Sequence, residues 1–123
     1  MIEVGLKYEV EQVVTEAMTA EAMGSGDMPV LATPAMIALM ENAAMLAVRD
    51  SLSEGQTTVG TYMDVSHIKP TKVGETVRAE AEVKGIEGKK ISFEVAAYWD
   101  DALLGKGTHT RYIVDREKFL SKL

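Results

Sequence analysis

The chain has 123 residues, a length typical of one domain, and 46% of them are apolar and 26% charged. This composition excludes a disordered tail, a collagen-like fibre and a membrane span, and the absence of cysteine excludes disulfides, zinc–thiolate sites and cysteine nucleophiles. The net charge of −6 argues against a general nucleic-acid binder, which needs a basic surface. The first ten residues lack the pattern of a signal peptide, so we expect residues 1–123 to form a single cytoplasmic domain without a membrane partner.

The first 30 residues predict one strand followed by an irregular segment. Apolar and charged side chains alternate over 6–14, with Leu6, Tyr8 and Val10 on one face, which is the period of a half-buried strand. The stretch 15–30 predicts a short helical turn and then a loop, because turn-forming residues gather at 24–29.

The strongest structural pattern is a long apolar helix over 34–51. We expect Thr33 to cap its first turn and Pro34 to occupy its first position, where a missing N–H costs nothing. Apolar residues lie on every face of this helix, and no glycine interrupts it. A helix that is apolar all round is expected to be buried all round, so the rest of the fold must wrap it.

Four strand-like segments follow, at 57–70, 73–86, 90–99 and 103–114, and Asp115 is expected to cap a short helix that ends the chain. Short turns between neighbouring strands predict an antiparallel sheet. The expected fold class is therefore α+β, with one antiparallel sheet curling around the long helix. Such a sheet leaves open edges and one side of the helix uncovered, so we expect at least a homodimer, with a tetramer left open.

Glu41 is the one charged residue between Thr33 and Val48, and its neighbours one helical turn away are apolar. A buried carboxylate without a partner is costly, so a partner is expected. One interpretation is a structural ion pair or hydrogen bond, for example across a dimer interface. The other, which we favour, is a general base, because apolar surroundings increase the affinity of a carboxylate for a proton.

Few other side chains could complete such a site. The two histidines, His67 and His109, are both candidates to pair with Glu41, and spacing alone does not choose between them. The Thr33 hydroxyl lies at a helix start, where an oxyanion is stabilised, although capping alone would explain it. Gly60 either lets a ligand approach the backbone or marks a bulge. No combination of residues predicts a metal site.

The charges are unevenly distributed along the chain. Residues 1–66 hold two basic and ten acidic side chains, whereas residues 67–123 hold eleven basic and nine acidic ones. An anionic ligand is therefore expected against the second half, unless these cations are simply solvated strand edges. The candidate cations are Lys69, Lys72, Arg78, Lys89, Lys90 and Arg111.

Three sequence runs together resemble a known family. They are LATPAMIALMENAA from residue 31, TVGTYMDVSHIKPTKVGETVRAEAEV from residue 58 and GKGTHTRYIVD from residue 105. Their order and spacing are similar to those of the hotdog-fold thioesterases of the fluoroacetyl-CoA thioesterase-like group. The resemblance implies a curved antiparallel sheet around a central helix, paired into dimers with active sites at the subunit interface.

The resemblance also implies roles for particular residues. Thr33, Glu41 and His67 match the family's catalytic set, and the Gly60 N–H matches a donor to the thioester carbonyl. Pro34, in the same motif as Thr33, and the cations Lys69 and Arg111 are the further candidates for substrate binding.

The leading hypothesis is an acyl-CoA thioesterase acting on a small or medium acyl group. A Glu41–His67 pair would activate water, and Thr33 with the Gly60 N–H would hold the oxyanion. Coenzyme A would be part of the substrate, and no other cofactor is expected. The alternatives are a non-catalytic acyl-CoA-binding module and a hotdog-type enoyl-CoA hydratase or dehydratase.

Overall fold

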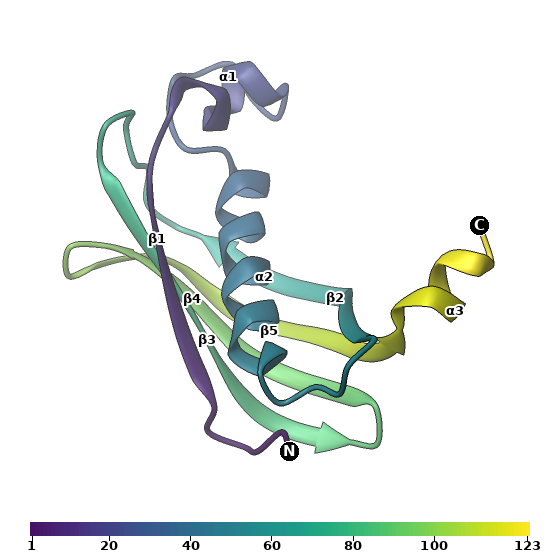
Figure 1. Ribbon diagram of the computed structural model, residues 1–123. Coiled ribbons are helices and arrows are strands. Elements are labelled where there is room, and N and C mark those ends of the chain that lie inside the picture. Colours follow the sequence, from purple (N-terminus) through teal and green to yellow (C-terminus); the bar gives the residue numbers. More distant parts are fainter.

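The computed structural model describes residues 1–123 and contains five strands and a central helix (Figure 1). The elements in chain order are β1 (Lys7–Val13), the 3-10 turn η1 (Glu16–Met18), α1 (Ala20–Met23), α2 (Thr33–Arg49), β2 (Gln56–His67), β3 (Thr76–Glu87), β4 (Lys90–Trp99), β5 (Ala102–Asp115) and α3 (Arg116–Ser121). Every strand and helix expected from the sequence is present, with ends shifted by a few residues. Asp115 caps α3 as expected, accepting a hydrogen bond from the Lys118 N–H at 2.9 Å.

The strands form one antiparallel sheet in the order β1-β3-β4-β5-β2. The turns after β3 and β4 join neighbouring strands, as expected. The step from β2 to β3 differs, because these strands lie on opposite sides of the β4–β5 hairpin. Their connection, 68–75, passes the start of α2 instead, where the Leu31 N–H donates to the Thr71 carbonyl at 2.8 Å. This crossing leaves β1 and β2 as the two edge strands.

Helix α2 packs on the inner face of the curved sheet (Figure 1). Alternate residues of β3 and β4 point toward it and are buried, and several of them are alanines, which let the helix approach closely. The buried core residues of these two strands are Val77, Ala79, Ala81, Val83, Ile91, Phe93, Val95 and Ala97.

The prediction that α2 is buried on every side is wrong for a single chain. The sheet covers one side of the helix, whose buried residues are Ala35, Met36, Met40, Ala43, Ala44 and Val48. Pro34, Ala38 and Asn42 lie on the uncovered side and are exposed. One sheet of five strands therefore leaves a stripe of α2, with these three residues, open beside the edge strand β2. None of the helices has both the length and the hydropathy needed to cross a membrane.

Two glycines of β5 allow an unusually close approach to β2. A Cβ at Gly107 would overlap the Asp64 carbonyl, and one at Gly105 would overlap the Ser66 carbonyl. Gly105 lies opposite His67 in the strand register and also contacts the side chain of Met36. The end of β2, which carries His67, is therefore held tightly between β5 and α2.

Candidate active site

Thr33 and His67 meet at the start of α2. The Thr33 Oγ1 lies 2.8 Å from the His67 Nδ1, a hydrogen bond between residues 34 positions apart. The expectation that Thr33 caps the helix is wrong: Ala32 is the N-cap, Thr33 is the first helical residue, and Pro34 follows it. The hydroxyl is therefore committed to the histidine and not to the free N–H groups of the helix.

His67 has the properties of a neutral imidazole. Burial lowers its pKa, because the charged form is poorly solvated where the ring lies. Its Nε2 is buried and has no hydrogen-bond partner within the chain. A neutral ring with one nitrogen on a hydroxyl and the other unpartnered is suited to moving a proton.

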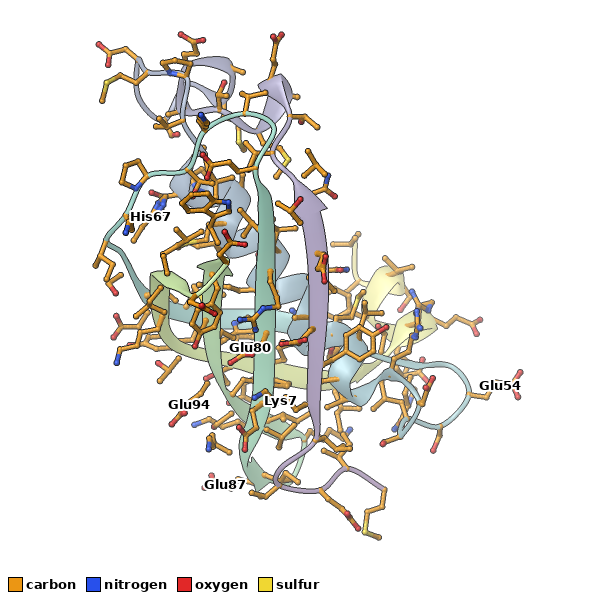
Figure 2. The ribbon with its side chains drawn as sticks, turned by 90° about the vertical axis from the view of Figure 1, so that its left-hand side faces the viewer. Lys7, Glu54, His67, Glu80, Glu87 and Glu94 are labelled. Atoms are coloured by element: carbon orange, nitrogen blue, oxygen red, sulfur yellow. The ribbon has the colours of Figure 1, made fainter.

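A hollow of about 310 Å³ opens beside Thr33 and His67. Its other lining residues are Ala20, Ser25, Val30, Leu31, Ala32, Ile68, Lys69 and Pro70. Lys69 is exposed and forms no ion pair, so its charge is available to an anion at this position. Figure 2 shows His67 at the end of the molecule that carries η1 and α1, away from Glu54 and Glu87.

Glu41 lies in a second cluster, over the strand β2. A Cβ at Gly60 would lie 2.9 Å from the Glu41 Oε2, 3.1 Å from the His109 Cε1 and 3.4 Å from the Arg111 Nη1. The carboxylate, the imidazole and the guanidinium thus converge on the Cα of Gly60. Gly60 also begins a bulge, because the register between β2 and β5 shifts between Gly60 and Tyr62. The expected bulge at this glycine is therefore confirmed, and side chains of α2 and β5 lie close to its backbone.

Within one chain, the histidine that lies near Glu41 is His109. Glu41 is near His109, and no hydrogen bond joins it to His67. Two clusters therefore lie along the uncovered side of α2: Thr33 with His67, and Glu41 with Gly60. A Glu41–His67 pair within a single chain has no support in this arrangement.

His109 and Arg111 are buried from solvent and satisfied by internal partners. Arg111, 7% exposed, donates from Nε to the Thr58 Oγ1 at 2.8 Å and from Nη2 to the Thr58 carbonyl at 2.9 Å. Its Nη1 lies 3.2 Å from the His109 Nε2. The expectation that Arg111 binds an anionic ligand is therefore not supported, because its guanidinium is enclosed and engaged.

These contacts fix the tautomer of His109. Its Nδ1 lies 2.7 Å from the Tyr62 carbonyl, which can only accept, and its Nε2 faces a guanidinium, which can only donate. The proton is therefore on Nδ1 and the ring is neutral. Burial lowers the pKa of His109, in agreement with this assignment. Burial also lowers the pKa of Arg111, and the Glu41 carboxylate opposes that change.

Sequence reasoning did not place Thr58 in this network or His109 and Arg111 together. One signal was present: His109 and Arg111 are two residues apart in a strand, so they must share one face. Two polar residues on a buried face must satisfy each other or nearby groups.

A larger hollow, of about 640 Å³, lies on the outer face of the sheet, and half of its lining residues are charged. Two of its carboxylates are engaged with cations: Glu80 with Lys7 at 3.7 Å and with Arg78 at 3.1 Å, and Glu82 with Lys84 at 3.3 Å. Figure 2 shows Lys7 and Glu80 close together on this face. The hollow contains no histidine, so the smaller one beside His67 is the better candidate site.

The structure brings no three His, Asp or Glu side chains together in a way that could hold a metal ion.

The half-buried His67 and the buried His109 predict how stability depends on pH. Both have lowered pKa values in the folded chain, whereas in the unfolded chain they take up protons near pH ~6.5. The unfolded state then binds more protons, so the free energy of unfolding should decrease as the pH falls from about 7 toward 5. Urea unfolding at several pH values measures this, and the double variant His67→Gln/His109→Gln should show a smaller slope. Glu9, whose pKa is lowered by Arg78, contributes only at lower pH. A free energy that stays constant or rises over this interval would contradict the prediction.

Comparison with known proteins identifies the family. Residues 14–117 match the fluoroacetyl-CoA-specific thioesterase family. The chain belongs to this family. It is 37% identical over 94 residues to the fluoroacetyl-CoA thioesterase of Streptantibioticus cattleyicolor, covering 76% of this chain and 68% of that protein. A solved structure of a fluoroacetyl-CoA thioesterase superposes with a TM-score of 0.92 at 32% identity, covering 99% of this chain and 95% of that one.

The chain is thus a thioester hydrolase, and the resemblance seen in the sequence is confirmed. The hotdog fold is confirmed too. A hot-dog-like protein from Thermanaerovibrio acidaminovorans shares it with a TM-score of 0.87, over 97% of this chain and 88% of that one, at 20% identity.

Proposed function

We propose that this thioesterase hydrolyses acyl-CoA thioesters that carry a small or medium acyl group. The observation that carries the proposal is the Thr33–His67 hydrogen bond at the start of α2, beside a hollow with a free lysine. Membership of a family whose named relatives act on fluoroacetyl-CoA supports the choice of a CoA thioester. Lys69 would contact the phosphates of coenzyme A, and Pro34 would line the entrance to the site.

In the proposed reaction, a water molecule attacks the thioester carbonyl carbon and loses a proton to Glu41. The developing oxyanion is stabilised by the Gly60 N–H, with the Thr33 hydroxyl and the α2 N-terminus contributing. Collapse of the tetrahedral intermediate breaks the C–S bond. His67, acting with Glu41 as an acid–base pair, returns a proton to the leaving thiolate, so that the products are a carboxylate and free coenzyme A.

A homodimer would bring the two clusters together. Thr33 and Glu41 are eight residues apart, about 12 Å along one helix, and do not touch. Both lie equally far from residue 37, so a two-fold axis near that point would place Thr33 of one subunit beside the Glu41 of the partner subunit. The exposed stripe of α2 and the open edge of β2, where Tyr62 is 57% exposed, would be covered in the same step. The charged outer face of the sheet favours a dimer over a tetramer.

The assembly is tested by substituting Ala38, which is exposed on that stripe. Wild-type protein should have twice the monomer mass of 13.4 kDa in light scattering after size-exclusion chromatography. Ala38→Glu should be monomeric, because it places a charge in an apolar interface, and it should lose activity with it. Ala22→Glu, on exposed α1, should remain dimeric and active. A wild-type monomer that turns over substrate would refute the dimeric site.

The reaction is tested by thiol release from a panel of acyl-CoAs of increasing chain length. We expect stoichiometric release of coenzyme A, greatest for short or medium chains. A hydratase or dehydratase would change the acyl chain of an enoyl-CoA without releasing thiol. A non-catalytic binding module would be stabilised by the same ligands against heat, with no turnover of any.

A further inference from the structure

The bulge in β2 is held by side chains of β5 on both sides. Arg111 donates to the Thr58 carbonyl, two residues before Gly60, at 2.9 Å. His109 donates to the Tyr62 carbonyl, two residues after Gly60, at 2.7 Å. The register shift lies between these two attachment points. The backbone of Gly60 is therefore fixed from both sides by bonds that regular strand pairing does not supply.

The two side chains are also fixed relative to each other. The Arg111 Nη1 donates to the His109 Nε2 at 3.2 Å, and its Nε donates to the Thr58 hydroxyl at 2.8 Å. His109 stacks on Phe93, with ring centroids 5.9 Å apart. Both residues are almost fully buried, so neither can move far without leaving a polar group unsatisfied. Such a network is rigid because every member has a defined partner.

The same pair bounds the position of Glu41. The Glu41 Oε2, the His109 Cε1 and the Arg111 Nη1 all lie within 3.4 Å of the point that a Cβ at Gly60 would occupy. Arg111 forms no ion pair with the carboxylate, but the two are close enough for Glu41 to oppose the lowering of the Arg111 pKa. The ring and the guanidinium occupy the space beside the carboxylate, so they limit how far its side chain can swing.

We propose that His109 and Arg111 are positioning residues, which hold the Gly60 N–H and the Glu41 carboxylate in the relative positions that thioester hydrolysis needs. This inference rests on the proposed function, because it concerns the groups assigned there to the oxyanion and the proton. Neither residue needs to touch the substrate. Their bonds to the carbonyls of Thr58 and Tyr62 set where the N–H points, and their side chains set where the carboxylate lies.

A pair of variants of equal size at position 109 tests the inference. His109→Asn keeps an N–H donor near the position of Nδ1, whereas His109→Leu has no donor for the Tyr62 carbonyl. We expect His109→Leu to lower kcat about 10- to 100-fold with little change in KM, because misplacement affects the transition state more than binding. His109→Asn should retain a kcat within a few-fold of the wild type. Equal losses in both variants would mean that the ring takes part in proton transfer, and would overturn the inference.

Arg111→Lys provides a second measurement, and it carries the test if His109→Leu does not fold. The substitution keeps the positive charge but removes the planar guanidinium, whose N–H groups bond to both Thr58 and His109. We therefore expect kcat to fall with KM nearly unchanged. Wild-type kcat in a folded Arg111→Lys would overturn the inference. Tyr112→Phe, on the same strand, is the matched control and should behave as the wild type.

The failure of this inference differs from the failure of the proposed function. If Glu41→Gln has full activity, the assigned reaction chemistry is wrong. If Glu41→Gln is inactive while the folded His109→Leu keeps wild-type kcat, only the positioning role is wrong. If both hold, adding His109→Leu to Glu41→Gln should cause no further loss, because the two residues act as one unit.

Discussion

Glu41→Gln should lower the rate of thiol release from acyl-CoA at least about 100-fold, while the folded structure is retained. The amide has nearly the shape of the carboxylate, so the close contact over Gly60 is preserved. An amide cannot accept the proton of the attacking water, which is the step assigned to Glu41. The change therefore separates proton transfer from packing.

The measurement is kcat and KM from the release of free coenzyme A, with circular dichroism and thermal unfolding on the same preparations. Glu54→Gln, in an exposed loop, makes the same chemical change away from the site and should leave the rate unaltered. A Glu41→Gln protein with wild-type kcat would show that the carboxylate has a structural role only, which is the other interpretation its sequence context left open.

Gly60→Ala should lower kcat about 100-fold with only a small loss of stability. A Cβ at this position would lie 2.9 Å from the Glu41 Oε2, closer than a real Cβ contact allows, and 3.1 Å from the His109 Cε1, which is tighter than most such contacts. The carboxylate is the end of a flexible side chain, so it can move away at a low energetic cost. That movement takes it out of its position over the Gly60 backbone, and the activity should be lost with it.

Gly85→Ala is the matched control for this substitution. Gly85 also lies at a bulge, in β3, but a Cβ added there would have the Ser92 Cβ as its nearest neighbour, at an ordinary 3.8 Å. Kinetics and urea unfolding of both variants should show full activity for Gly85→Ala and loss of kcat for Gly60→Ala. A fully active Gly60→Ala would mean that the position of the Glu41 carboxylate does not limit the rate.

Much of the fold could be predicted because its signals are local. The alternation at Ile91, Phe93 and Val95 requires a strand with one buried face, and this strand is present. Asp115 caps the final helix because a capping bond joins residues three positions apart. The step from β2 to β3 was harder to predict, because it depends on where residues 68–75 find partners, and they find them at the start of α2.

The candidate site divides in the same way. The sequence indicated Thr33, Glu41, His67 and Gly60 as residues of interest, because a lone carboxylate, scarce histidines and a strand glycine stand out in the order of residues alone. It also favoured Thr33 as the cap of the helix, which is wrong because Ala32 is the N-cap, and it gave no sign that Arg111 is engaged within the chain. Each depended on what lies across the fold: His67 for the hydroxyl, and Thr58 with His109 for the guanidinium.

The sequence by itself determined an α+β chain with one long apolar helix and, within it, one carboxylate that needs an explanation. These properties follow from residue types and their spacing along the chain, which no tertiary contact can change. Only the tertiary structure decided that Glu41 faces His109 and that Thr33 bonds to His67. Those pairings join α2 to strands that follow it in the chain, and their distances are fixed by sheet register, a bulge and the packing of α2, none of which local sequence specifies.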